Sequence, residues 1–100
     1  MSVLEPGDVD AALAGGLDWT RQGAELIKVR TGRDFADSLT YAVAVGTLAE
    51  AMNHHPDIEI RWNVVTLRLS THSAGGITRA DLALARQIDA LAGAADAAQA

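Results

Sequence analysis

The residues best suited to chemistry lie in one short stretch of the chain and at one more distant position. Two adjacent histidines, His54 and His55, follow a carboxylate at Glu50, and the third histidine of the chain is His72. Imidazole changes its charge near neutral pH, so these side chains can act as general acid and general base. A nearby carboxylate can orient an imidazole ring and raise its basicity. The residue types therefore indicate an acid–base site.

Two other interpretations of the same residues are open from the sequence. A histidine in the last turn of a helix interacts favourably with the helix dipole and needs no catalytic role. A metal site is the second, since Glu50, His54 and His72 have the two nitrogens and one oxygen of a facial triad. Adjacent histidines, a carboxylate and a remote third histidine together favour acid–base chemistry over both.

A helix has to position the first of these groups. Asp34 is a suitable N-cap, and apolar residues recur with a helical period over residues 35–52. The apolar stripe is wide, so we expect this helix to be central and well buried. Pro56 disfavours helical geometry at the residue before it, so the helix should end at about His54. Glu50 and His54 would then lie on one helical face, one turn apart.

A hairpin has to position the third histidine. Residues 58–62 and 65–70 each alternate between apolar and polar side chains, with Asn63 at the turn between them. This pattern predicts a half-buried antiparallel hairpin. The same parity puts His72 off the core face, where the second strand ends. Trp62 falls on the apolar side, and we expect it in the core or in an interface.

The last helix begins with a capping signal. Thr78 and Asp81 occupy the two ends of a Thr-x-x-Asp capping box, which explains Asp81 without any catalytic role. We expect Gly93 to end this helix and residues 94–100 to fray. The glycine pair before the helix lacks the spacing and context of a phosphate loop, so no cofactor is expected there.

The remaining elements complete one fold. Residues 6–14 have a short helical pattern, and residues 17–31 predict a hairpin with its turn at Gly23. The order is therefore α-β-β-α-β-β-α. Two hairpins can form one four-stranded antiparallel sheet with three helices on one face, so we expect an α+β fold. A chain of 100 residues suits a single domain, residues 1–100.

Composition narrows the classes of function. The net charge of −5 repels phosphate backbones, so we expect no direct binding to nucleic acid. The absence of cysteine rules out disulfides and thiolate metal sites. With no leader pattern and no apolar run of membrane-spanning length, we expect a cytoplasmic protein without membrane contact. Only 4% of residues are aromatic, so the core is thin and self-association is expected.

The sequence resembles the pterin-4a-carbinolamine dehydratase family. The resemblance is strongest over about residues 49–89, and it extends more weakly to Trp19 and Asp34. The matching residues are Ala49-Glu50, His54-His55-Pro56-Asp57, Trp62-Asn63, Leu69-Ser70-Thr71-His72, Gly76-Ile77-Thr78, Asp81, Leu84-Ala85 and Ile88-Asp89. The resemblance implies the same α+β architecture, a four-stranded antiparallel sheet with three helices on one side.

The resemblance also implies an enzyme, a hydro-lyase that dehydrates 4a-hydroxytetrahydropterin to quinonoid dihydropterin. This step recycles tetrahydrobiopterin after aromatic amino acid hydroxylation, so a hydroxylase is an implied partner in the pathway. The family needs no metal and no cofactor, and its members form homodimers or homotetramers. One animal member also acts as a dimerisation cofactor for a transcription factor. A non-catalytic dimerisation or assembly factor on this fold is therefore the alternative.

The family's active histidines fall on His54, His55 and His72, and its supporting carboxylates fall on Glu50 and Asp81. The reaction needs an acid at the leaving hydroxyl and a base near the ring nitrogen. We expect His54 and His72 to share this work and His55 to position the pterin. Glu50 would hold an imidazole or a ring N–H, and Asp81 would cap its helix and support His72.

Overall fold

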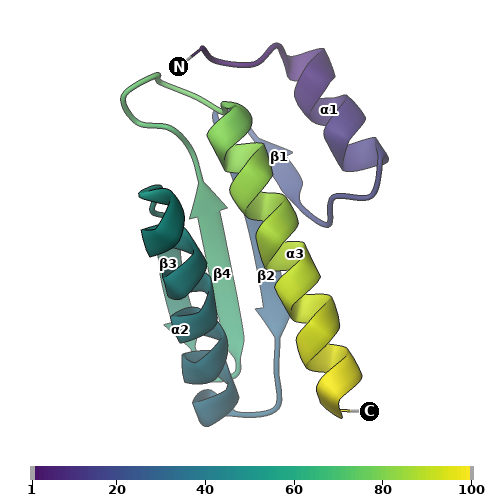
Figure 1. Cartoon of the computed structure of the whole chain (residues 1–100), viewed down its shortest axis with the longest axis vertical. Coiled ribbons are helices and arrows are strands. Elements are labelled where there is room, and N and C mark those ends of the chain that lie inside the picture. The colour runs from purple at the N-terminus through teal and green to yellow at the C-terminus, as the bar shows by residue number, and fades with distance from the viewer. Residues whose placement is uncertain (1, 100) are drawn as a thin grey trace.

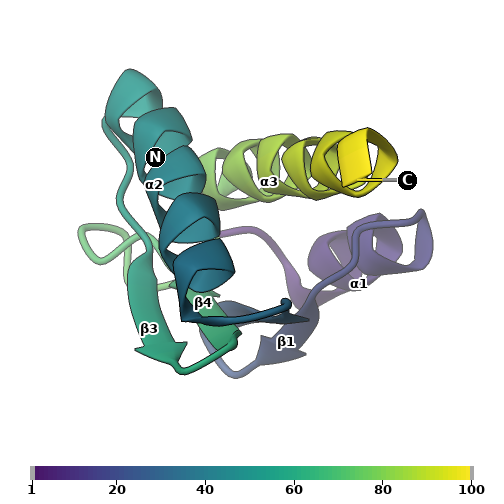
Figure 2. The same cartoon turned by 90° about the horizontal axis from the view of Figure 1, so that it is seen from below.

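The four strands form one antiparallel sheet, and the three helices all cover the same face of it (Figures 1 and 2). This computed structural model describes the backbone of residues 2–99 and the side chains of residues 2–91. The elements are α1 (Pro6–Ala14), β1 (Thr20–Gln22), β2 (Glu25–Thr31), α2 (Phe35–Met52), β3 (Asp57–Arg61), β4 (Val64–Leu69) and α3 (Arg79–Gln99). The predicted fold class and element order are confirmed.

Strand β4 lies inside the sheet, because the strand order is β1-β2-β4-β3. Leu69 pairs with Leu26 of β2, and Leu67 pairs with Ile58 of β3. Every second side chain of β4 is fully buried against the helices, as the alternation predicts. The strand's C-terminal end, which leads to His72, is thereby held from both sides.

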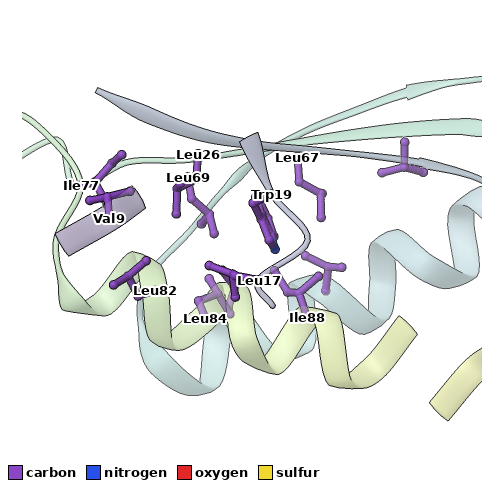
Figure 3. Close-up of a cluster of buried hydrophobic side chains, with 14 of the residues drawn as sticks. Val9, Leu17, Trp19, Leu26, Leu67, Leu69, Ile77, Leu82, Leu84 and Ile88 are labelled. Atoms are coloured by element: carbon purple, nitrogen blue, oxygen red, sulfur yellow. The ribbon is translucent and has the colours of Figure 1, made fainter. Parts of the chain in front are cut away.

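The core lies between the sheet and the helices. Figure 3 shows Leu26, Leu67 and Leu69 of the sheet facing Leu84 and Ile88 of α3, and all five are fully buried. The other members of the buried cluster are Val9, Leu17, Trp19, Tyr41, Val45, Ala49, Val65, Ile77, Leu82 and Ala85. No helix in the part of the chain that the structure describes is long and apolar enough to cross a membrane.

Helix α2 ends earlier than predicted. Its last residue is Met52, and Asn53 closes it in the left-handed conformation with φ 51°. The backbone N–H of His54 donates to the carbonyl of Ala49 at 3.0 Å and satisfies one of the last helical acceptors. Asparagine tolerates this closing geometry, so the helix stops before the restriction from Pro56 acts. His54 therefore lies outside the helix, and the predicted shared face with Glu50 is wrong.

Helix α2 is also less buried than its wide apolar stripe predicted. Tyr41, Val45 and Ala49 face the core, but Phe35 and Leu39 are each 45% exposed. The helix packs on the sheet at one side only, so the second half of the stripe faces solvent. The start of the helix follows the prediction, because Asp34 accepts a hydrogen bond from the backbone N–H of Asp37.

Two further local predictions need correction. In the β3–β4 turn the left-handed residue is Trp62, with φ 53°. Its side chain is 65% exposed and lies outside the core of this chain, and its predicted place in an interface stays a prediction. Asn63 instead donates its side-chain amide to the carbonyl of Gly32, 3.1 Å away, which fixes the turn against the β2–α2 loop. Helix α3 continues past Gly93, because its alanine-rich sequence favours helix and one glycine costs only about 1 kcal/mol. Fraying of residues 94–100 stays a prediction, and Ala100 lies outside the described residues.

A buried lysine ties the first hairpin to the last helix. The ammonium of Lys28 contacts the carboxylates of Asp89 at 2.9 Å and Asp18 at 3.1 Å, and Asp89 also accepts from the indole N–H of Trp19. Burial acts to lower the pKa of Lys28, but the hydrogen bonds to Asp89 and Asp18 and the charges of these carboxylates together outweigh it and raise the pKa above its usual value. The charge is thus retained inside the fold.

Candidate functional site

Asp81 is the centre of the candidate site. It lies in the first turn of α3, and its side chain is fully buried. Its Oδ2 atom accepts from the backbone N–H of Thr78 and from the hydroxyl of Thr71, each at 2.8 Å. Its Oδ1 atom lies 2.5 Å from Nε2 of His54. The predicted capping role of Asp81 is confirmed, and the same carboxylate also contacts an imidazole.

His54 follows the end of α2 and lies at the edge of the core, with its side chain 15% exposed. We expected Asp81 to support His72, but the structure pairs Asp81 with His54. The reason is the direction of the chain after β4. Thr71 bridges to Gly76 and turns its own side chain inward to Asp81, so the next residue, His72, faces solvent.

Glu50 contacts the other member of the histidine pair. Its Oε2 atom is hydrogen-bonded to Nε2 of His55. Both side chains are exposed, 77% for Glu50 and 55% for His55. Because the chain turns away from the helix axis at Asn53, the residue five positions after Glu50 comes back beside it. The sequence predicted a pair between Glu50 and His54, and the structure pairs Glu50 with His55 instead.

His72 lies in a tight loop that starts beside Asp81. The carbonyl of Thr71 accepts from the backbone N–H groups of Ala74 and Gly75, and the N–H of Thr71 donates to Gly76 at 2.9 Å. Gly75 has φ +80°, which favours glycine in this loop. The loop places the exposed His72 one residue away from Thr71, which contacts the same carboxylate as His54. Asp81 thus connects the two segments that carry candidate histidines.

The structure does not assemble the metal site that the sequence left open as an alternative. Among the side chains that the structure describes, no group of three histidine, cysteine or acidic residues gathers closely enough to hold a metal ion. Glu50 and His54, two of the three ligands considered, face different partners, His55 and Asp81.

Thr71 is the residue of this site that sequence reasoning missed. It is buried, and its hydroxyl contacts both Asp81 and the hydroxyl of Thr78 at 2.8 Å. A signal was present, because the parity of Leu67 and Leu69 continues to position 71 and puts a polar side chain on the core face. A buried hydroxyl needs partners, and Asp81 and Thr78 supply them.

The family model described as pterin 4 alpha carbinolamine dehydratase matches residues 2–91. The chain belongs to this family. The match covers the helix end, the hairpin and the start of α3, so it includes all five candidate residues of this dehydratase-family chain.

Curated relatives agree with the family assignment. The chain is 48% identical over 89 residues to a protein of Mycobacteroides abscessus, covering 89% of this chain and 95% of the relative. It is 47% identical over 88 residues to a protein of Roseiflexus castenholzii, covering 88% and 95%. Both relatives carry the provisional name pterin-4-alpha-carbinolamine dehydratase.

Two solved structures with a similar fold carry different functional descriptions. One, from Brucella melitensis, is described as a transcriptional coactivator/pterin dehydratase. It superposes with a TM-score of 0.83 and 25% identity, over 89% of this chain and 97% of that chain. The other is described as a pterin dehydratase-like protein identified as a RuBisCO assembly factor in the alpha-carboxysome. It has a TM-score of 0.64 and 29% identity, over 76% and 90%. The dehydratase fold is thus described both with an enzyme's name and with an assembly role.

Proposed function

We propose that this chain catalyses the dehydration of 4a-hydroxytetrahydropterin to quinonoid dihydropterin and water. The observation that carries the proposal is the contact between His54 and the buried carboxylate of Asp81, with His72 on the loop that starts beside it. A histidine oriented by a buried carboxylate is suited to proton transfer near neutral pH.

The reaction needs two proton transfers. The C4a–O bond breaks as the hydroxyl takes up a proton and leaves as water, and N5 loses its proton as the C4a–N5 double bond forms. We propose that His54 and His72 share these transfers, one as acid and one as base. His55 positions the pterin ring, and Glu50 holds the imidazole of His55.

The setting of the reaction is part of the same proposal. The pterin is the small-molecule substrate, and the class of reaction that supplies it is the hydroxylation of an aromatic amino acid. We also propose a cytoplasmic location and a homodimer or homotetramer. The partly exposed apolar residues of α2 support self-association, because such a surface is costly to leave in water.

The test is stopped-flow absorbance of freshly generated 4a-hydroxytetrahydropterin with the wild-type protein. We expect acceleration over buffer, and we expect His54→Ala and His72→Ala each to lower kcat by roughly 10²–10⁴-fold. His55→Ala should raise KM more than it lowers kcat. Arg61→Ala, an exposed change on β3, is the control and should leave both constants unchanged. A folded wild-type protein that does not accelerate the dehydration over buffer would contradict the proposal.

A second candidate function is a protein-assembly role without catalysis. The observations that favour it are the structural similarity to the RuBisCO assembly factor and the exposed apolar side of α2. The variant His54→Ala separates the two functions. An enzyme loses turnover in this variant and keeps its assembly, whereas an assembly factor has no turnover to lose.

A further inference from the structure

Three separate parts of the chain contact the carboxylate of Asp81. Thr71 contributes its hydroxyl from the end of β4, Thr78 its backbone N–H from the start of α3, and His54 its ring from the end of α2. The carboxylate is fully buried, so water does not replace any of them. A buried carboxylate needs hydrogen-bonding partners, and this one has two donors besides its contact with His54.

The contacts of Thr71 give a direction to the hydroxyl protons beside this carboxylate. An ionised carboxylate can only accept, so the single hydroxyl proton of Thr71 points to Oδ2 of Asp81. The hydroxyl oxygens of Thr71 and Thr78 lie 2.8 Å apart, so Thr78 must then donate to Thr71. Thr78 in turn accepts from the backbone N–H of Ala80 at 3.3 Å. The result is a directed chain of donors that ends on Asp81.

This arrangement determines which nitrogen of His54 carries the proton in the neutral ring. Oδ1 of Asp81 faces Nε2 of His54, and only a proton on Nε2 gives a hydrogen bond between them. The other ring nitrogen, Nδ1, then has a free lone pair. We propose that Thr71 is a positioning residue that acts through Asp81 to hold His54 in its Nε2–H tautomer, with Nδ1 as the nitrogen that exchanges a proton with the substrate. The role of Nδ1 toward the substrate rests on the proposed function, whereas the tautomer of His54 does not.

The contribution of Thr71 differs from simple helix capping. The backbone N–H of Thr78 alone would complete the capping interaction with Asp81. The Thr71 hydroxyl adds a second donor to Oδ2, which directs Oδ1 toward His54. Without that hydroxyl, the carboxylate has one donor fewer to hold it and can turn out of line with Nε2 of His54. A weaker hydrogen bond at Nε2 would then leave the neutral ring with less preference for a single tautomer.

The first test is long-range proton–nitrogen NMR on protein labelled with ¹⁵N-histidine, at a pH where the rings are neutral. We expect wild-type His54, assigned by its loss in His54→Ala, to show a protonated Nε2 and an unprotonated Nδ1. Thr71→Val should give a mixture of tautomers, and Thr71→Ser should restore the wild-type pattern. Thr66→Val, on the opposite face of β4, is the matched control and should change nothing. A proton on Nδ1 in the wild type would overturn the proposal.

The second test is kinetic. Thr71→Val should lower kcat about tenfold with KM little changed, a part of the roughly 10²–10⁴-fold that a positioned acid or base contributes. Thr71→Ser should recover most of this loss. A folded Thr71→Val protein with the wild-type tautomer and wild-type kcat would contradict the positioning role, and Thr71→Ala repeats the test if the valine variant does not fold. If the wild type shows no dehydratase activity, the NMR result still decides the tautomer.

Discussion

The two carboxylates of the candidate site lie in opposite environments. Asp81 is fully buried and accepts hydrogen bonds from two donors besides its contact with His54. Glu50 contacts His55 at the surface, where both side chains are mostly exposed. An exposed pair is screened by water and contributes little stability, whereas a buried charge with satisfied partners is costly to disturb.

We therefore predict unequal effects of removing these two charges. Asp81→Asn should lower the free energy of unfolding by about 2–3 kcal/mol, because charge-assisted hydrogen bonds are lost and a buried N–H is left poorly satisfied. Glu50→Gln should lower it by less than about 1 kcal/mol. Urea denaturation of both variants at pH 7 measures the difference. Equal losses in the two proteins would show that the burial of Asp81 has no energetic weight.

At the scale of elements, the loop between β2 and α2 is held by the acidic side chain of Asp37. The carboxylate of Asp37 accepts from the backbone N–H of Arg33 at 2.9 Å and contacts Arg30 at 3.5 Å. Gly32 leaves the room for it, since a Cβ there would lie 2.1 Å from Oδ2 of Asp37. The hydrogen bond from Arg33 and the charges of Arg30 and Arg33 lower the pKa of Asp37.

This lowered pKa predicts a pH-dependent contribution to stability. A carboxyl whose pKa is lower in the folded protein stabilises the fold above its unfolded pKa, which is about 3.9, and loses that effect as the pH falls through the folded value. Asp37→Asn should therefore be less stable than wild type at pH 7, and the difference should shrink below about pH 4. Thermal unfolding of both proteins across this range measures it. A constant difference between them would contradict the assignment.

At the scale of the whole molecule, one apolar side of α2 is left exposed to solvent in a single chain. Phe35, Leu39 and Val43 recur every four residues along the helix, and all three are exposed. The thin aromatic content of the chain limits what one copy can bury. A second copy covering this surface would add the apolar contact that the small core lacks.

We predict that Leu39→Glu lowers the mass of the assembly, because a charge in an apolar interface has to lose its hydration. The matched control is Val29→Glu, an equally drastic change at an exposed valine on the uncovered face of the sheet. Sedimentation of both variants beside wild type gives the masses. A monomeric wild type, or dissociation by Val29→Glu alone, would move the interface away from α2.

Local signals in the sequence determined the order of elements, the caps at Asp34 and Thr78, and the alternation that buries β4. Each of these depends on residues within a few positions of one another, so periodicity and capping chemistry are enough. The candidate histidines and carboxylates were also evident, because their types and spacing match the family pattern. The sequence determined which groups are present.

Only the tertiary structure decided which of these groups meet. The left-handed conformation of Asn53 ended α2 early and placed His55 beside Glu50. The helical period of the sequence does not encode this single backbone conformation. Asp81 reached His54 across a separation of 27 residues because α3 packs beside α2. Thr71 entered the site because α3 starts beside the end of β4. Contacts of this kind depend on how the helices pack on the sheet, and that packing is a property of the whole fold.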